Sequence, residues 1–322
     1  MEPSRSQSLE TFFQVAYKDV EEKIVEIIPD QKILSILKGG KRLRPLLATL
    51  AFKACTGGNE TTSQYQRFLE GAVSVELAHN ASLVHDDIID GDMKRRGKLA
   101  FYIKEGIDNA ILLGHKMLAI GFDIALSHGD KTAKLYVDTW NKTLTGQLTE
   151  VNFNTGDLYE TKDIRADSKF FQLYSTIVDL KTASLFSAAC KAAAFEAHVP
   201  EELAEILSEY GREVGFSFQL ADDLADLEKG ERIDSVVIPL LARLEKKSIK
   251  NGSVSAKILK KKLEQNLPEI KRLYISEIKK HLRKAEALSS LEIIPENSFK
   301  LLLQSAPTYV INTMLKEIEI SI

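Results

Sequence analysis

The stretch Ala81-Ser-Leu-Val-His-Asp-Asp-Ile-Ile-Asp90 joins an apolar helical pattern to three carboxylates. In an α-helix, residues four apart lie on one face about one turn from each other, so Asp86 and Asp90 point together and Asp87 flanks them. Such a cluster is either solvated at a helix end or neutralised by a cation. Carboxylates of this kind suit Mg²⁺, which completes its coordination with water and phosphate oxygens.

A second stretch, Phe216-Ser-Phe-Gln-Leu-Ala-Asp-Asp-Leu-Ala-Asp226, repeats the arrangement with Asp222, Asp223 and Asp226 at the same spacing. Two separate apolar helices ending in the same carboxylate triplet are not expected by chance. We expect the two clusters to face a shared charge and to hold several Mg²⁺ ions around one diphosphate. Mg²⁺ would stabilise the diphosphate as a leaving group by neutralising its developing negative charge.

A glycine-rich segment, Lys38-Gly-Gly-Lys-Arg-Leu-Arg-Pro45, precedes a predicted helix that carries Lys41, Arg42 and Arg44. Glycines let the backbone approach an oxyanion closely, and a helix start adds amide donors, so a second diphosphate could bind here. The alternative is an ordinary turn with solvated cations.

Further candidate hydrogen-bond donors to phosphate are spread along the chain. His79 lies two helical turns before Asp86 on the same face, although a lone histidine is more often structural. Arg95 and Arg96 follow the first cluster, and a guanidinium is well shaped to hold phosphate oxygens. Lys181-Thr182 lies inside an apolar helix predicted from Tyr174 to Ala194, where a cation needs an anionic partner.

The composition favours an all-α fold. Hydrophobic residues make up 44% of the 322 residues, and 17 glycines and 8 prolines leave long stretches without helix breakers. Without a repeat or a linker-like segment, residues 1–322 are expected to form a single large helical domain. A net charge of −3 excludes general attraction to nucleic acid. Two cysteines, no signal pattern and no run of 18 uncharged apolar residues predict a cytoplasmic protein without a transmembrane segment.

Together, the Gly39 to Pro45 segment, both aspartate clusters, Arg95-Arg96 and Lys181-Thr182 resemble the trans-isoprenyl diphosphate (polyprenyl) synthase family. The resemblance covers most of the chain, in the family's order. It implies an all-α homodimer of the isoprenoid synthase type I fold, with helices around a central apolar cavity. It also implies condensation of isopentenyl diphosphate with an allylic diphosphate, head to tail and trans, with release of diphosphate.

The resemblance assigns roles to residues as well. The acceptor, isopentenyl diphosphate, would be held by Lys41, Arg44, His79 and Arg96. Magnesium on the allylic diphosphate would be bound by Asp86, Asp90 and Asp222, with support from Asp87, Asp223 and Asp226. The allylic site would be completed by Arg95, Lys181, Thr182, Gln147 and Gln219.

Three departures from the family pattern stand out. Lys98-Leu99-Ala100 follows Gly97 where Pro-Thr is usual, and Gly114-His115 stands where Gly-Asp is expected. The stretch between Asp226 and Pro239 is shortened, and Ser235 replaces an expected lysine, for which Lys229 is a candidate substitute. The altered stretch and His115 motivate one alternative, a catalytically weak, regulatory subunit of a heteromeric synthase. The other alternative is a class I terpene cyclase, which binds no acceptor diphosphate.

The helix before the first cluster carries small residues where a growing hydrocarbon would run. Ser82, Ala78 and Ser74 descend one face in steps of about 6 Å, with Ala81 alongside. These residues predict a product longer than fifteen carbons, C20 or above, with Leu118 or Phe122 as the floor of the tunnel. The alternative is that small residues only permit close helix packing.

Overall fold

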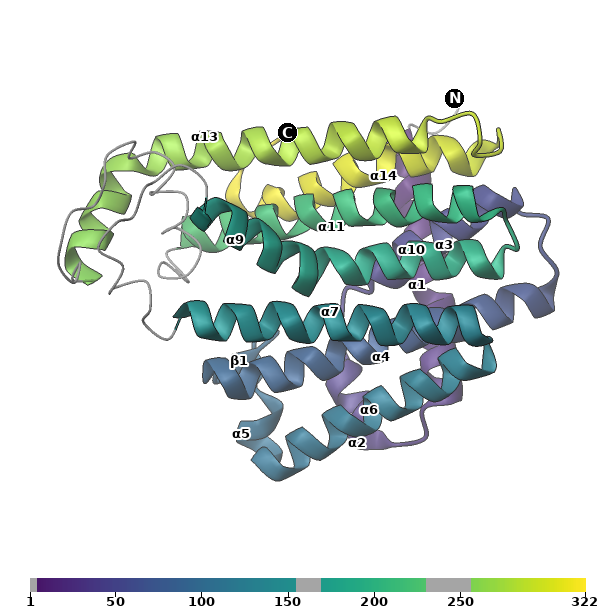
Figure 1. Ribbon diagram of the computed structural model, residues 1–322, viewed down its shortest axis with the longest axis horizontal. Helices are drawn as coiled ribbons and strands as arrows, with labels where there is room; N and C mark the ends of the chain where they lie inside the picture. Colours follow the sequence, from purple (N-terminus) through teal and green to yellow (C-terminus); the bar gives the residue numbers. More distant parts are fainter. Residues whose placement is uncertain (1–4, 155–168, 230–255) are drawn as a thin grey trace. The chain divides into compact units, whose positions relative to one another are not determined.

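The computed structural model describes residues 5–154, 169–229 and 256–322 (Figure 1). It confirms the predicted all-α class, because the described chain consists almost entirely of helices. Within these residues the strands are β1 (Lys94–Arg95) and β2 (Lys98–Leu99), which pair antiparallel.

By the proximity of its Cα atoms the chain divides into two compact units. Unit 1 comprises Met1–Trp140, Leu185–Gly211 and Ser289–Ser305, and unit 2 comprises Asn141–Ser184, Arg212–Leu288 and Ala306–Ile322. We describe each unit by itself. A single domain over residues 1–322 stays a prediction.

Unit 1 is organised around α4 (Thr62–Asp90), which contacts the helices α1 (Arg5–Ile27), α2 (Gln31–Leu37), α3 (Leu43–Thr56), α5 (Phe101–Glu105) and α6 (Ile107–Ser127). The N-cap Thr61 accepts a hydrogen bond from the backbone N–H of Gln64, and Gly91 ends the helix at φ +70°. Between these caps the helix is apolar on most sides and is buried from Phe68 to Leu77 except at Glu70. Unit 1 also contains the first part of α7 (Asp130–Asn154) and nearly all of α10 (Ser184–Glu196).

Unit 2 contains the rest of α7, α9 (Lys169–Val178), the π-helical turn η1 (Asp179–Ala183) and the second half of α11 (Glu201–Lys229). It also takes most of α13 (Ala256–Ser289), the end of α14 (Ser298–Leu315) and η2 (Lys316–Ile318). One apolar core joins these elements, and its fully buried members include Ala183, Ala221, Leu224, Ile270, Ile278 and Ile311.

Helix α6 is long and apolar enough to cross a membrane by length and composition, with a mean hydropathy of 1.5. One side of it packs on α4 in unit 1. Gly121 permits this packing, since a Cβ there would lie 3.3 Å from the backbone oxygen of Ser74. The other side leaves Ile107, Leu112 and Leu126 at least half exposed.

The glycine-rich segment forms a turn rather than the start of a helix. Helix α3 begins at Leu43, so Lys41 and Arg42 precede it, contrary to the sequence prediction. Gly39 has φ +80°, and a Cβ on Gly40 would lie 2.4 Å from the Arg42 guanidinium. The turn is therefore folded around a buried arginine.

Arg42 is held by carboxylates of unit 1. Its Nε lies 2.7 Å from Glu21 Oε1, and its Nη1 lies 2.7 Å from Glu76 Oε1 on α4. Its Nη2 donates to the Leu37 carbonyl at 2.6 Å. The Arg42 side chain is 1% exposed, so these bonds satisfy a charge that water cannot reach. This cation supports the fold.

We expect Arg42→Ala to lower the free energy of unfolding by about 3–5 kcal/mol, because it leaves the Glu76 carboxylate buried without its partner. Urea unfolding followed by circular dichroism measures this change. Lys41→Ala, at an exposed position one residue away, is the matched control and should stay within about 0.5 kcal/mol of the unmutated protein. Equal stabilities of the two variants would contradict the structural role of Arg42.

Candidate active site

The first aspartate cluster occupies the last turns of α4. Asp86 and Asp87 are buried, whereas Asp90 is exposed. Asp87 Oδ1 accepts hydrogen bonds from Arg95, of which the one from Nε is 2.7 Å long and the other comes from Nη2. Burial raises the pKa of Asp87 despite this pairing. The middle aspartate is thus oriented by an arginine, and its oxygens point away from solvent.

The short hairpin after α4 places Arg95 and Arg96. Arg95 pairs with Lys98 across the strands, so Arg96-Gly97 form a two-residue turn with φ +52° and +73°. Both residues have positive φ, as in a type I′ hairpin turn. Arg96 Nη2 donates to Asn80 Oδ1 at 3.0 Å, and its Nη1 lies 3.3 Å from the Ile36 carbonyl. The hairpin therefore sends Arg95 to the carboxylates and Arg96 to the glycine-rich turn.

His79 lies among the cations of unit 1. Burial and the guanidiniums of Arg44, Arg96 and Arg42 hold the pKa of His79 well below its usual value, so the imidazole is neutral. Arg44 is itself buried, with its guanidinium carbon 4.5 Å from the centre of the Phe186 ring. The structure thus places three of the predicted acceptor-site residues in one positive neighbourhood. Lys41, the fourth, is exposed in the adjacent turn.

His85 takes no part in this group. Its ring packs edge-on against the His115 ring at 5.2 Å between centroids, and Nε2 lies 3.4 Å from the Ile111 carbonyl of α6. His85 therefore faces α6 rather than the cations around His79.

The second aspartate cluster lies near the end of α11 in unit 2. Asp222 is exposed and Asp226 is half-buried, whereas Asp223 is buried. Asp223 Oδ1 accepts from Gln219 Nε2 at 2.9 Å, and Oδ2 accepts from the Tyr174 hydroxyl. As in the first cluster, the middle aspartate is buried and fixed by neighbouring donors.

Gln219 connects this cluster to the π-helical turn η1. Its Oε1 accepts from Thr182 Oγ1 at 2.8 Å, so Thr182, Gln219 and Asp223 form one hydrogen-bonded chain. Lys181 Nζ donates to Glu150 Oε2 of α7 at 2.6 Å. The structure therefore brings two predicted allylic-site residues, Thr182 and Gln219, together with Asp223 in unit 2, and gives Lys181 a carboxylate partner, Glu150, that the sequence did not reveal.

Helix α7 runs close to η1 beside Gln147. A Cβ on Gly146 would lie 2.9 Å from the backbone nitrogen of Lys181, so glycine is needed at this crossing. The amide oxygen and nitrogen of Gln147 are buried and make no hydrogen bond within the described part of the chain. Buried polar atoms normally have partners, and an unpaired amide next to η1 fits a site built for a polar ligand.

The donor chemistry of both clusters fits Mg²⁺, because every predicted ligand is a carboxylate oxygen. In the part of the chain that the structure describes, no three His, Cys, Asp or Glu side chains converge tightly enough to enclose a metal. Mg²⁺ commonly uses one or two carboxylates and takes its other ligands from water and substrate phosphates. The residues therefore suit a metal that arrives with a diphosphate.

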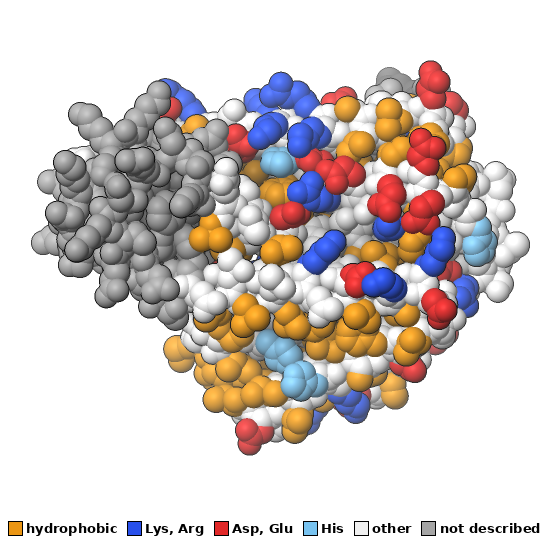
Figure 2. All heavy atoms as spheres, viewed as in Figure 1, with side chains coloured by type: hydrophobic (Ala, Val, Ile, Leu, Met, Phe, Trp, Pro, Cys, Tyr) orange, Lys and Arg blue, Asp and Glu red, His pale blue; other side chains and the backbone are white. Residues whose placement is uncertain are grey.

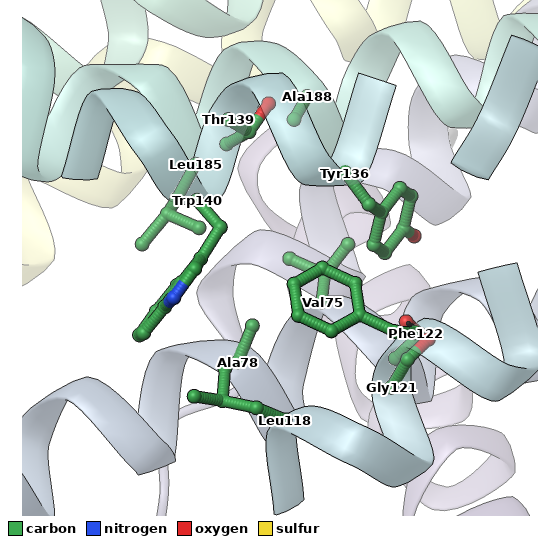
Figure 3. A pocket seen from close by; sticks show the side chains of 11 residues that line it. Val75, Ala78, Leu118, Gly121, Phe122, Tyr136, Thr139, Trp140, Leu185 and Ala188 are labelled. Atoms are coloured by element: carbon green, nitrogen blue, oxygen red, sulfur yellow. Dashed lines mark hydrogen bonds between the residues drawn. The ribbon is translucent and has the colours of Figure 1, made fainter. Parts of the chain in front are cut away.

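A narrow apolar cavity, here called cavity A, lies in unit 1 and is lined by Ser74, Val75, Ala78, Leu118, Gly121, Phe122, Tyr136, Thr139, Trp140, Leu185 and Ala188 (Figure 3). It includes two predicted chain-length residues, Ala78 and Ser74, and both predicted floor residues, Leu118 and Phe122. Ser82 and Ala81 are not among its lining residues. Ser82 donates to the His79 carbonyl at 2.7 Å, and Ala81 is fully buried.

Sequence reasoning missed Tyr174, Asn80 and Glu150 because each acts through a partner distant in the chain. No spacing rule reveals such contacts. Lys229, the candidate substitute for the lysine expected at position 235, pairs with Glu317 at 3.1 Å. Ser235 and the altered stretch around it lie outside the described residues.

The helical fold is that of the all-α isoprenoid synthase class, and two of its helices carry the carboxylate clusters near their ends. The chain belongs to the polyprenyl synthetase family, whose model matches residues 30–234.

Named relatives agree with this family. The chain is 36% identical over 201 residues to geranylgeranyl diphosphate synthase of Methanosarcina mazei, covering 61% of this chain and 57% of that protein. It is 31% identical over 233 residues to short chain isoprenyl diphosphate synthase of Methanothermobacter thermautotrophicus, covering 69% and 66%. The matches thus span less than two thirds of these relatives.

Solved structures agree over nearly the whole chain. Geranylgeranyl pyrophosphate synthetase from Geoglobus acetivorans superposes with a TM-score of 0.73 at 25% identity, covering 93% of this chain and 99% of that one. The Pyrococcus horikoshii geranylgeranyl pyrophosphate synthetase gives 0.74 at 23% identity, covering 96% and 99%. The second likeness supports the fold alone.

The pKa of Asp223 is raised to about 7, chiefly by burial and also by the charges of Asp222 and Asp226, against the lowering effect of the hydrogen bonds from Tyr174 and Gln219. An aspartate in the unfolded chain has a pKa of about 3.9. The folded state therefore keeps this proton when the unfolded state has lost it. The contribution of Asp223 to stability is fully present below about pH 3.9 and is lost as the pH rises through about 7.

We expect Asp223→Asn to flatten the pH dependence of stability in the ligand-free protein. In the unmutated protein, Asp223 makes the free energy of unfolding fall by up to about 1.4 kcal/mol per pH unit between about pH 4 and pH 7. The variant should lack this decrease. Urea titrations across this range measure it. Asp222→Asn, at the exposed neighbour, should retain the slope of the unmutated protein, and the same slope in both variants would show that Asp223 titrates normally.

Proposed function

We propose that this protein is a Mg²⁺-dependent prenyltransferase that condenses isopentenyl diphosphate with an allylic diphosphate to give a polyprenyl diphosphate of C20 or longer. The observation that carries the proposal is the shared construction of the two clusters. In each, the middle aspartate is buried and oriented by fixed donors, Arg95 for Asp87 and Tyr174 with Gln219 for Asp223. Such fixed carboxylates suit a preorganised site for a metal-bound diphosphate.

In this proposal the acceptor diphosphate binds to the positive neighbourhood of unit 1, formed by Lys41, Arg44, His79 and Arg96. The neutral His79 imidazole can donate one hydrogen bond to a phosphate oxygen without adding to the repulsion between the guanidiniums. An incoming dianion offsets that repulsion, which favours binding there. The turn at Gly39 and Gly40 lets backbone approach the same anion.

The allylic diphosphate takes the carboxylate clusters and their neighbours. Asp86, Asp90 and Asp222, supported by Asp87, Asp223 and Asp226, would hold Mg²⁺ with this substrate, and the metal would supply positive charge against the leaving diphosphate. Arg95, Lys181, Thr182, Gln147 and Gln219 complete this site. Gln147 contributes a buried amide without a protein partner in the described residues, and Lys181 contributes a cation held by Glu150.

The chemistry assigns simple tasks to these side chains. The allylic C–O bond breaks, and Lys181, Thr182 and Arg95 hold the departing diphosphate. The double bond of the acceptor then forms a C–C bond to the allylic carbon, and a proton leaves the acceptor for the released diphosphate. No side chain acts as a nucleophile, so the protein positions the substrates and excludes water.

The relatives bear on the alternatives. They are named as geranylgeranyl, geranylfarnesyl and short-chain isoprenyl diphosphate synthases, which disfavours both the terpene cyclase and the weak subunit. Cavity A supports elongation, since Ala78 and Ser74 leave its α4 wall without bulky side chains.

A homodimer forms part of the proposal. Helix α6 and the residues before it expose an apolar surface, here called the α6 face: Leu99, Ile103, Ile107, Ile111, Leu112 and Leu126. Figure 2 shows hydrophobic side chains gathered where Figure 1 places α5 and α6. Exposed apolar patches of this kind mark association surfaces, and a second copy of the chain is the partner that we propose. A cytoplasmic location is proposed from the two free thiols, Cys55 and Cys190.

Purified protein supplied with farnesyl diphosphate, isopentenyl diphosphate and Mg²⁺ is expected to release diphosphate and to form a longer polyprenyl diphosphate. Chelation of the metal should abolish both. Asp90→Asn and Asp222→Asn should each lower the rate about 10²-fold or more, because each removes a charge that stabilises the leaving group indirectly. Diphosphate release and mass spectrometry of the products measure these outcomes.

The matched control is Asp138→Asn, an exposed aspartate of α7 that pairs with Lys134. Its rate should equal that of the unmutated protein. Diphosphate release without isopentenyl diphosphate would indicate a cyclase, and no release by the pure protein would favour the subunit alternative.

We expect Leu112→Glu to convert a dimer into monomers, because Leu112 is 66% exposed on the α6 face and a carboxylate would be desolvated there on association. Light scattering after size-exclusion chromatography measures the mass. Leu301→Glu, at a leucine of α14 that is 43% exposed, should remain dimeric. A monomeric unmutated protein would refute the homodimer.

A further inference from the structure

Cavity A is followed by a second narrow cavity along α4, here called cavity B. Both lie within unit 1, and both are lined by Val75 and Tyr136. On α4, cavity A is lined by residues from Ala78 to Ser74, about 12–18 Å along the helix from Asp86, whereas cavity B is lined by residues from Val75 to Phe68, about 17–27 Å from Asp86. The two spaces therefore succeed one another with increasing distance from the first aspartate cluster.

Tyr136 lies where the two cavities meet, since it lines both, and its hydroxyl is anchored. It is 7% exposed, and its hydroxyl donates to the Gly71 carbonyl of α4 at 2.7 Å. Rotating the ring would leave the hydroxyl without this bond in apolar surroundings, which is unfavourable. A Cβ on Gly71 would lie 3.9 Å from the hydroxyl oxygen, an ordinary van der Waals distance, so the bond does not depend on a glycine there.

The predicted floor residues lack such an anchor. Leu118 and Phe122 have purely hydrocarbon side chains, and in Figure 3 the ring of Phe122 lies between those of Trp140 and Tyr136. The free volume is small, about 20 Å³ in cavity A and about 10 Å³ in cavity B, which is room for about one water molecule. A hydrocarbon tail must therefore displace side chains, and Leu118 and Phe122 can rotate without breaking a hydrogen bond.

Beyond Tyr136 the walls of cavity B are built from small side chains, among them Ala72, Ala189 and Ala192. Part of its lining is polar, because the buried His128 Nδ1 lies 2.8 Å from Glu196 Oε1. Cavity B could therefore accept a limited additional length of hydrocarbon if Tyr136 were absent, and the His128–Glu196 pair would oppose further growth.

We propose that Tyr136 ends the hydrocarbon cavity and thereby sets the maximum chain length of the product. The ring acts as a fixed partition across the path from cavity A to cavity B. The assignment replaces Leu118 and Phe122 as the floor and makes them movable walls. It rests on the proposed prenyltransferase function, because it concerns the tail of that reaction's product.

The test compares product lengths by mass spectrometry. Tyr136→Ala should join the two cavities and add at least one five-carbon unit to the longest product. Tyr136→Phe keeps the ring but loses the bond to Gly71, so a mixture of the original and longer products is expected. Ala78→Phe, which fills cavity A from α4, should shorten the product.

Tyr210 provides the matched control. It is a fully buried tyrosine of unit 1 whose hydroxyl donates to the Leu303 carbonyl at 2.7 Å, and it lines neither cavity. Tyr210→Ala and Tyr210→Phe should lose stability much as the Tyr136 variants do, yet keep the original product lengths. Unchanged product lengths in Tyr136→Phe and Tyr136→Ala, or the same lengthening in the Tyr210 variants, would overturn the proposal.

A binding measurement separates this inference from the proposed function. Calorimetry with unreactive allylic thiodiphosphates of increasing tail length needs no turnover. Tyr136→Ala, or Tyr136→Leu if the alanine variant fails to fold, should bind the longest tails about tenfold or more tightly relative to the unmutated protein. Tighter binding of long tails without turnover would support Tyr136 as the partition and contradict the proposed prenyltransferase function. Turnover with unchanged product lengths and unchanged affinities would support that function and contradict the role of Tyr136.

Discussion

The construction of this protein depends on holding carboxylates at the ends of apolar helices. An unpaired buried carboxylate is strongly unfavourable, and each cluster places its middle aspartate out of water. Arg95 satisfies Asp87, and Tyr174 with Gln219 satisfies Asp223. Because these donors fix the middle residue, the rotation of the whole helix end is fixed as well. The backbone positions from which the flanking aspartates extend are then set without a ligand.

The two clusters achieve this with opposite chemistry. Asp87 is held by a cation, whereas the described residues hold Asp223 with a phenol and an amide, which do not compensate its charge. The raised pKa of Asp223, about 7, follows from burial without a cation. A metal ion bound together with a diphosphate would bring positive charge to the second cluster and so stabilise the ionised form of Asp223. In the first cluster Asp87 already has Arg95 as a cationic partner. Asp223 of the second cluster therefore depends more on a bound ligand for compensation of its charge.

Spacing rules predicted the helices and the positions of the six aspartates, because helical periodicity is a local property of the sequence. They failed where a side chain is defined by a distant partner. Arg42 and Arg44 look equivalent in the sequence. In the structure, however, Arg42 forms ion pairs with Glu21 and Glu76, while Arg44 lies over the ring of Phe186. The π-helical turn at Lys181 was equally hidden, since it results from one extra residue in a turn rather than from a residue type.

The same helix carries both the metal-binding end and the wall of the hydrocarbon cavity, and this continuity constrains how product length can be set. Between Gly71 and Asp86 the rise of α4 is fixed, so distance from the reacting end cannot be adjusted along it. A bulkier side chain on α4, as in Ala78→Phe, shortens the space, whereas in our proposal a longer space requires a change on α7. In unit 1 the contact concerned is the Tyr136 hydroxyl on the Gly71 carbonyl, a bond to backbone that no substitution on α4 removes directly. Selection for longer products would therefore act more easily through the side chain on α7 than through α4.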